Sequence, residues 1–319
     1  MILLSLFGSR LLPEFREQIE AEADGRELLI SIKPEEIEKS LDRIEIAMGD
    51  VSHALIPRMP NIKWLQLWSA GADFLQHFPA LKEHPLIITS ASGVHVHQMA
   101  EHFFAMLLGW SRGLPAVYEA RHKHQWMRVK EQQLAGLNGK TLLILGYGNI
   151  GQSIARIAVA FGMQVTGLRQ NISRSTAITG VKLEEASKLM SLLPSADYVL
   201  NLLPLTSETR HSFDAGKFAV MKKTALYINL GRGPTTDEDA LIEALNSKTI
   251  AGALLDVTET EPLPETSALW DMDNVMITGH YAGLHPGYSR LAMDIALENL
   301  RRYKRGEALV NVVDKVKGY

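Results

Sequence analysis

Three side chains in the second half of the sequence have the chemistry to act together on one small molecule. Arg232 lies between two glycines, Glu261 precedes a proline in an acidic run, and His280 follows a glycine. Each comes a few residues after an apolar run of strand length. Because the carboxyl ends of parallel strands meet at one edge of a sheet, we expect the three side chains to lie close together.

These residue types fit the transfer of a hydride to a carbonyl group. A guanidinium holds a substrate carboxylate and polarises the carbonyl, and an imidazolium donates a proton to the alkoxide that forms. A neighbouring carboxylate keeps the imidazole protonated near neutral pH, because an ion pair raises the pKa of histidine. Arg232, His280 and Glu261 are predicted to take these roles in that order. Taken singly, the arginine would be a surface ion-pair partner, and residues 256–262 would be an acidic turn.

A hydride-carrying cofactor is indicated by residues 141–161, where an apolar run meets a Gly-x-Gly-x-x-Gly turn that opens onto a helical pattern. Gly146 permits the tight turn, Gly148 lets a pyrophosphate approach the backbone, and Gly151 lets helix and strand pack closely. The N–H groups and the dipole at the helix N-terminus favour an anion. A purely structural glycine turn is the alternative, but the position between a strand and a helix predicts dinucleotide binding.

The residues after the next predicted strand indicate which dinucleotide is bound. An acidic residue that would hold the adenosine ribose is expected about 20 residues past the glycines, yet residues 163–183 contain no Asp or Glu. Arg169 and Arg174 lie there instead, and a guanidinium pairs with a 2′-phosphate. We therefore expect NADPH to be preferred, with NAD possible. Alternatively, these arginines only solvate a surface loop.

The apolar pattern predicts an α/β protein with two doubly wound parallel-sheet domains, a Rossmann cofactor domain inserted into a flavodoxin-like substrate domain. The substrate domain is expected at 1–97 and 286–319, and the dinucleotide-binding domain at 98–285. Predicted strands are 2–7, 28–30, 44–47, 64–67, 86–89, 141–145, 163–168, 197–202, 224–229, 250–255 and 274–277. Predicted helices are 12–23, 34–40, 94–113, 115–130, 150–161, 184–192, 214–220, 236–246 and 287–304.

The composition excludes several classes of function. The chain has 319 residues, which suffices for two domains, and its 46% hydrophobic and 22% charged residues are typical of a globular protein. A net charge of −3 gives no field that would recruit nucleic acid or an anionic membrane. No cysteine is present, which excludes disulfides and thiolate metal sites. The apolar runs are too short for a membrane span or a signal peptide, so a cytoplasmic protein is expected.

The histidine pairs of the sequence do not predict a metal site. His95 and His97, like His122 and His124, are two residues apart. On a helix that spacing points the side chains in different directions, so neither pair can share a metal ion. His102 lacks a second histidine at the spacing of a zinc-binding helix. We expect no metal.

The order of these motifs closely resembles the D-isomer-specific 2-hydroxyacid dehydrogenase family over nearly the whole chain. Besides the glycine turn and the arginine, acid and histidine segments, the match includes residues 137–140, 203–206 with Thr209, 221–222, 237–241 and 269–275. Gly279 departs from the family pattern, because many members have a proline before the histidine.

The resemblance implies a role for each site residue. Arg232, Glu261 and His280 match the catalytic arginine, acid and histidine of the family. A loop whose backbone N–H groups hold the substrate carboxylate, together with Arg232, is matched by Ser69, Ala70 and Gly71. Asp256 is placed near the nicotinamide amide, and Met99 beside the nicotinamide. The full set expected to bind the cofactor is Gly146, Tyr147, Gly148, Asn149, Ile150, Gly151, Arg169, Arg174, Leu203, Pro204, Thr209, Leu230, Asp256, Gly283 and Met99.

The resemblance implies an NADPH-dependent reductase that converts a small 2-oxo acid, such as glyoxylate, hydroxypyruvate or an alkyl or phenyl analogue, to the D-2-hydroxy acid. It also implies a homodimer. The alternatives are a dinucleotide-sensing binding module, like the corepressors that resemble the family, and an NAD-linked dehydrogenase of phosphoglycerate or formate. Trp126 has two interpretations: it packs on the predicted helix at 115–130, or it reaches a substrate pocket, in its own subunit or a partner's.

Overall fold

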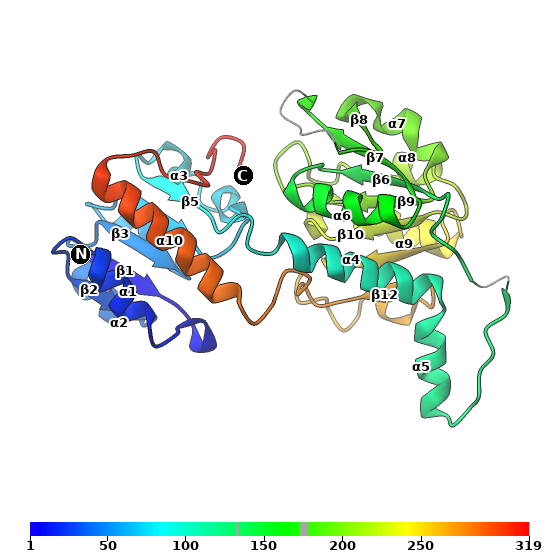
Figure 1. Cartoon of the computed structure of the whole chain (residues 1–319), viewed down its shortest axis with the longest axis horizontal. Coiled ribbons are helices and arrows are strands. Elements are labelled where there is room, and N and C mark those ends of the chain that lie inside the picture. Colours follow the sequence, from blue (N-terminus) through cyan, green and yellow to red (C-terminus); the bar gives the residue numbers. More distant parts are fainter. Residues whose placement is uncertain (132–133, 173–177, 319) are drawn as a thin grey trace. The chain divides into compact units, whose positions relative to one another are not determined.

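The chain folds into two compact units. The computed structural model describes residues 1–131, 134–172 and 178–318 (Figure 1). Unit 1 comprises Met1–His95 with His285–Tyr319, and unit 2 comprises Val96–Leu284. The boundaries expected from the sequence were 97 and 286.

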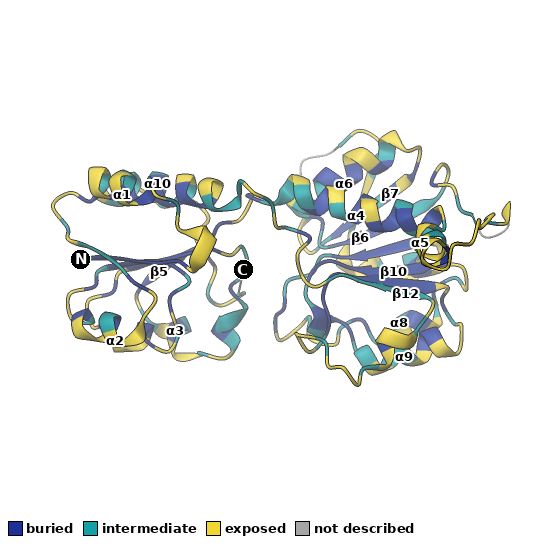
Figure 2. Cartoon of the chain, turned by 90° about the horizontal axis from the view of Figure 1, so that it is seen from below, coloured by how far each residue is buried: buried dark blue, intermediate teal, exposed yellow. Residues whose placement is uncertain are grey.

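Unit 1 is built on a parallel sheet. Its described residues form five strands in the order β2-β1-β3-β4-β5, the order of a flavodoxin-like fold. The strands are β1 (Ile2–Ser5), β2 (Leu28–Ile30), β3 (Ile46–Gly49), β4 (Trp64–Leu67) and β5 (Ile87–Thr89). One face is covered by α1 (Phe15–Glu22) and α10 (Tyr288–Arg305), and the other by α2 (Pro34–Ile37) and α3 (Ala80–Glu83) (Figure 2).

Helix α10 belongs to unit 1 although it follows unit 2 in the sequence. Its residues Met293, Ala296 and Leu300 recur at helical spacing and are buried in the same cluster as Ile2 and Trp64. The charged side chains of α10 are not among its buried residues, whereas the polar Asn299 is buried and donates a hydrogen bond to Gln66 at 3.0 Å. The first and last parts of the chain therefore share one hydrophobic core.

Unit 2 carries a larger parallel sheet. Its described residues form seven strands in the order β12-β11-β10-β9-β6-β7-β8. This is the strand order of a Rossmann fold, extended by one strand. The strands are β6 (Thr141–Leu145), β7 (Gln164–Arg169), β8 (Val181–Glu185), β9 (Tyr198–Asn201), β10 (Leu226–Asn229), β11 (Gly252–Leu255) and β12 (Val275–Ile277).

The helices of unit 2 lie on both faces of this sheet. Helices α4 (Val96–Ser111) and α6 (Asn149–Ala160) cover one face, and α8 (Ala215–Ala219) and α9 (Glu238–Asn246) cover the other (Figure 2). The short α7 (Leu189–Leu192) follows β8. Helix α5 (Leu114–His122) extends away from the rest of unit 2 (Figure 1). The prediction of two doubly wound parallel sheets is confirmed.

Three local predictions were wrong. The predicted helix at 184–192 begins instead as strand β8, which pairs with β7 at the edge of the sheet. Its charged residues, such as Lys182 and Glu184, obscured the alternation of an edge strand, where one face meets solvent. The predicted helix at 115–130 ends at His122, and Trp126 beyond it is 91% exposed. The interpretation of Trp126 as a helix-packing residue is therefore also wrong.

In the part of the chain that the structure describes, no helix is long and apolar enough to cross a membrane. The same residues contain no cluster of three or more His, Asp or Glu side chains that could hold a metal ion.

Candidate active site

The carboxyl edge of the unit 2 sheet brings the three predicted catalytic residues into adjacent loops. Arg232 follows β10, Glu261 lies in the loop after β11, and His280 follows β12, and these strands are neighbours in the sheet. The Nδ1 of His280 lies 2.6 Å from Oε2 of Glu261. Since Nδ1 is engaged in this pair, Nε2 is the nitrogen from which His280 can donate a proton to another molecule.

The backbone around His280 is held by one buried carboxylate. His280 has a φ of 53°, in the left-handed region that side-chain-bearing residues rarely adopt. Its N–H donates to the backbone oxygen of Asp256 at 2.8 Å. The carboxylate of Asp256 accepts hydrogen bonds from the N–H groups of Tyr281 at 3.2 Å and Ala282 at 3.0 Å. Asp256 therefore shapes the turn that presents the imidazole.

The loop of Arg232 packs tightly against the loop of Glu261. A Cβ at Gly233 would lie 1.8 Å from the backbone oxygen of Thr258, so only glycine fits there. The N–H of Thr258 in turn donates to Oε1 of Glu261 at 3.2 Å. The Arg232 guanidinium donates to the carbonyl of Gly231 at 2.8 Å. Backbone contact thus fixes the arginine segment beside the acid.

Glu261 and His280 stabilise each other's charged forms. The hydrogen bond with Glu261 raises the pKa of His280, against the opposing effects of burial and of the Arg232 charge. Burial alone would raise the pKa of Glu261, but the hydrogen bond and charge of His280, with Arg232, outweigh it and lower that pKa. His280 therefore keeps its proton to a higher pH than an ordinary histidine.

The glycine turn between β6 and α6 has the geometry of an anion site. Gly146 has a φ of 84°, and a Cβ there would lie 2.8 Å from the backbone oxygen of Leu202. Gly148 caps α6 without a side-chain hydrogen bond, and a Cβ built on it would meet nothing within 4 Å. The first N–H groups of α6, from Asn149 and Ile150 onward, therefore face a space with no side-chain cap, as pyrophosphate binding requires.

Tyr147, within the same turn, is a packing residue. Its ring lies against Gly167 of β7, where a Cβ would approach within 2.3 Å. The residue is fully buried, and burial raises the pKa of its hydroxyl. Gly151 faces Ile144 of β6, where a Cβ would lie 3.2 Å from the isoleucine side chain. These contacts fix α6 against the sheet.

The loop after β9 is also well ordered by its own hydrogen bonds. Leu203 donates its N–H to the side chain of Asn201 at 3.0 Å. The hydroxyl of Thr209 donates to the carbonyl of Pro204 at 2.6 Å and accepts from the N–H of Thr206 at 2.7 Å. These residues lie at the same carboxyl edge as the glycine turn.

Of the remaining residues expected to bind the cofactor, some follow strands at the carboxyl edge of the sheet and others are buried. Leu230 and Gly283 follow β10 and β12, and Arg169 is the last residue of β7. Arg174 lies outside the described residues. Met99 is only 7% exposed and belongs to the core beneath α4. Asp256 is only 3% exposed, and backbone and hydroxyl donors already engage both carboxylate oxygens.

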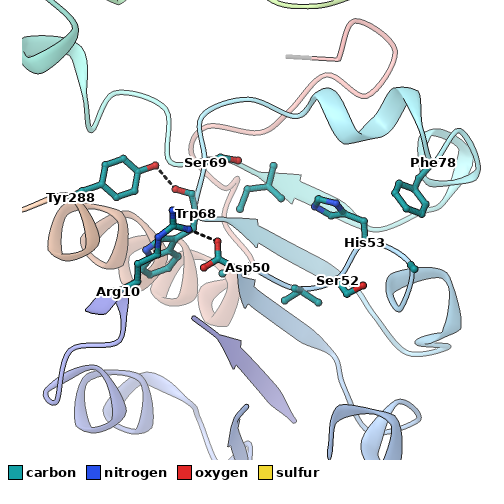
Figure 3. Close-up of a pocket in the computed structure, with 12 residues that line it drawn as sticks. Arg10, Asp50, Ser52, His53, Trp68, Ser69, Phe78 and Tyr288 are labelled. Atoms are coloured by element: carbon teal, nitrogen blue, oxygen red, sulfur yellow. Dashed lines mark hydrogen bonds and ion pairs between the residues drawn. The ribbon is translucent and has the colours of Figure 1, made fainter. Parts of the chain in front are cut away.

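Unit 1 has a pocket at the carboxyl edge of its own sheet. The pocket encloses about 480 Å³ beside the loop that begins at Ser69 (Figure 3). Arg10 and Asp50 face each other across a 2.6 Å ion pair in its wall. His53 is stacked on Phe74 with ring centroids 3.8 Å apart, and burial lowers the pKa of the imidazole. The ionised groups of the wall therefore compensate each other.

The loop expected to hold a carboxylate, Ser69, Ala70 and Gly71, follows β4 in unit 1. The hydroxyl of Ser69 donates to the carbonyl of Gly71 at 2.9 Å, which curls the loop. The backbone oxygen of Ser69 accepts from the N–H of Ala91 at 2.9 Å. Only Ser69 of the three lines the pocket.

Sequence reasoning missed several polar residues near these sites. Three of them, Arg10, Asp50 and His53, lie in the loops after β1 and β3. Their position after apolar runs of strand length is the pattern that could have predicted them. His102 was considered only as a metal ligand, yet it lies 3.0 Å from the hydroxyl of Thr278.

The Rossmann strand order, the uncapped glycine turn and the glutamate-paired histidine beside an arginine define a class: dinucleotide-dependent oxidoreductases. The sequence profile "D-isomer specific 2-hydroxyacid dehydrogenase, NAD binding domain" matches residues 104–282. The chain belongs to this family and is an oxidoreductase with an NAD(P)-binding domain.

Characterised relatives show the range of the family. Over 294 residues the chain is 33% identical to the glyoxylate/hydroxypyruvate reductase B of Enterobacter sp. (strain 638), covering 89% of this chain and 90% of that protein. Over 277 residues it is 31% identical to the D-3-phosphoglycerate dehydrogenase of Methanocaldococcus jannaschii, covering 86% of this chain but 52% of that protein.

A solved structure matches the whole chain. It is the NADPH-dependent glyoxylate/hydroxypyruvate reductase of Sinorhizobium meliloti in complex with NADP and sulfate. The TM-score is 0.82 at 30% sequence identity, and the alignment covers 100% of this chain and 99% of that one.

The ion pair between Glu261 and His280 leads to a testable prediction about the pKa of His280. In Glu261→Gln the pKa of His280 should fall, because the carboxylate charge is lost while burial and Arg232 still oppose protonation. The protonated form exists below the pKa, so it should disappear at lower pH than in the wild type. NMR titration of the imidazole signals measures this, with His280→Asn identifying the signal. An unchanged pKa in Glu261→Gln would show that the pair does not control the proton.

Proposed function

We propose that the protein is an NADPH-dependent reductase that converts a small 2-oxo acid to the D-2-hydroxy acid. The observation that carries this proposal is the 2.6 Å pair between His280 and Glu261, at the sheet edge where Arg232 also lies. A proton donor with a raised pKa next to a cation is what the reduction of a carbonyl next to a carboxylate requires. The names of the relatives support the same substrate class.

The residues divide the chemistry between them. NADPH, when bound, supplies the hydride. Arg232 would hold the substrate carboxylate and polarise the carbonyl. His280 would donate its Nε2 proton to the new alkoxide. Glu261 would stabilise the imidazolium before the transfer, and the ion pair is lost when the proton leaves.

The ionisable side chains of the unit 1 pocket compensate each other or are neutral. Asp50 and Arg10 compensate each other, and His53, with its lowered pKa, is neutral at pH 7.

Turnover tests this proposal directly. Wild-type protein should oxidise NADPH in the presence of glyoxylate, hydroxypyruvate or phenylpyruvate, as followed by the absorbance of the reduced nicotinamide. His280→Ala should lower kcat by about 10²- to 10⁴-fold, the usual contribution of a general acid. It should retain NADPH binding, measured by fluorescence. Near-normal turnover in His280→Ala would refute the assignment of the proton donor.

The preference for NADPH over NADH rests on charge. Arg169 ends β7, where a Rossmann domain meets the adenosine ribose, and no acidic residue lies between 163 and 183. The NADP-bound structure of the Sinorhizobium meliloti relative supports this choice. Arg174 is included because of its position in the sequence alone, since it lies outside the described residues.

Replacing Arg169 and Arg174 together with alanine should lower kcat/KM for NADPH by about 10- to 100-fold, because charge-assisted hydrogen bonds to the 2′-phosphate are lost. The value for NADH, which has no such phosphate, should change much less. Steady-state kinetics with both cofactors measure the ratio. Equal losses with the two cofactors would contradict the proposed role of these arginines.

The alternatives have weaker support. A dinucleotide-sensing binding module would not need the paired proton donor, and turnover at ordinary enzyme rates would exclude it. A D-3-phosphoglycerate dehydrogenase is among the relatives, but the absence of an acidic residue between 163 and 183 disfavours NAD as the cofactor of this chain.

A homodimer belongs to the same proposal. Helix α5 and the residues after it extend away from the rest of unit 2 (Figure 1) and expose apolar side chains, Tyr118 at 60% and Trp126 at 91%. Exposed aromatic groups of this size are typical of protein interfaces. Sedimentation equilibrium should give a dimer, and Tyr118→Glu with Trp126→Glu should shift it to the monomer. A monomeric wild type would refute the dimer.

A further inference from the structure

A second histidine is connected to the loop of His280 through the half-buried Thr278 and the buried Asp256. His102 lies on α4, and its Nε2 is 3.0 Å from the hydroxyl of Thr278, just after β12. The hydroxyl of Thr278 donates to Oδ1 of Asp256 at 2.6 Å. The Nε2 of His102 also lies 3.6 Å from the same oxygen. All three residues belong to unit 2.

The geometry assigns the direction of each hydrogen bond. A hydroxyl has one proton, and Thr278 donates it to Oδ1 of Asp256. The hydroxyl can then only accept from His102, so Nε2 of His102 must carry a proton. Burial lowers the pKa of His102, with Asp256 opposing. His102 is therefore a neutral imidazole with its proton on Nε2.

This series of hydrogen bonds ends at the backbone segment that carries His280. Asp256 receives the Thr278 hydroxyl and the N–H of Tyr281 on Oδ1, and the N–H of Ala282 on Oδ2. These bonds bracket His280, whose φ is 53°. A left-handed conformation at a residue with a side chain persists only where its surroundings impose it.

We propose that His102, acting through Thr278 and Asp256, is a positioning residue that fixes the backbone on which His280 is held against Glu261. His102 does not exchange a proton with substrate in this scheme. Its N–H completes the hydrogen-bonding of Thr278, which keeps the hydroxyl proton directed at Asp256. The edge-on contact of His102 with the ring of Tyr281, at 5.1 Å between centroids, supports the same loop.

Few charged groups face these histidines in the described residues. His280 is influenced by Glu261, Arg232 and Asp256, and His102 by Asp256. If the loop relaxes, the contact between His280 and Glu261 lengthens while Arg232 and burial still disfavour the proton. Loss of His102 should therefore lower the pKa of His280, an effect that a general loss of stability would not produce.

Four variants test the proposal. His102→Leu removes the donor and keeps the bulk, and Thr278→Val removes the hydroxyl at nearly constant shape. His102→Gln can still donate to Thr278, and Thr278→Ser keeps the hydroxyl. His97→Leu, at an exposed position on the same helix, is the matched control. All are compared by thermal melting, kinetics with NADPH and a 2-oxo acid, and NMR titration of His280.

His102→Leu and Thr278→Val should lower kcat by about 10- to 100-fold with little change in KM, the size expected for a misplaced catalytic group. The alkaline limb of the kcat profile and the pKa of His280 should both move to lower pH. His102→Gln and Thr278→Ser should largely restore both, and His97→Leu should match the wild type.

An unchanged kcat and His280 pKa in folded His102→Leu would overturn the proposal. So would a lower melting temperature with an unchanged His280 pKa, which marks a merely structural role. The kinetic arm rests on the proposed reductase function, whereas the NMR arm does not. If the wild type reduces no 2-oxo acid, the proposed function fails, and the pKa comparison still decides the role of His102.

Discussion

The buried carboxylate of Asp256 is the interaction on which the rest of the candidate site depends. Asp256 follows β11, which lies between β10 and β12 in the sheet. Its carboxylate accepts hydrogen bonds from Thr278, Tyr281 and Ala282, which follow β12. A free carboxylate in the interior is costly, so a charge that is almost fully enclosed must be met by several donors. The turn around His280 supplies these donors. The hydrogen bonds that compensate the buried carboxylate therefore also determine where the imidazole of His280 lies.

The charges at this edge are balanced so that the histidine can both hold and release a proton. Glu261 favours the imidazolium, and Arg232 opposes it. An imidazole beside an acid alone would be a weaker proton donor, because the ion pair is lost when the proton leaves. The arginine reduces that cost, and a bound substrate carboxylate would in turn screen the arginine. Under the proposed function, the protonation of His280 would therefore depend on whether a substrate is bound.

The sequence predicted those features whose causes are local. The turn at 146–151 could be predicted because each glycine answers a steric demand of neighbouring residues, and most strands because apolar runs of that length fold alike in many contexts. Strand β8 was missed, because its charged residues are acceptable only at a sheet edge, and edge position is a property of the whole sheet. The link between His102 and Thr278 spans 176 residues, and no local pattern carries it. Trp126 was misjudged for a similar reason, since the end of α5 at His122 leaves it beyond the helix.

The position of α10 has a consequence for how the chain is made. Unit 2 is complete in sequence at Leu284, whereas one face of the unit 1 sheet lacks its main cover until Tyr288–Arg305 has been synthesised. During translation the strands of unit 1 emerge first, yet they are the last to bury their apolar side chains, Ile2 and Trp64 among them. The cofactor-binding unit can therefore fold while the nascent chain still exposes half of the other core. That apolar face is therefore exposed throughout the synthesis of unit 2, and exposed apolar surface on a partly folded chain favours aggregation.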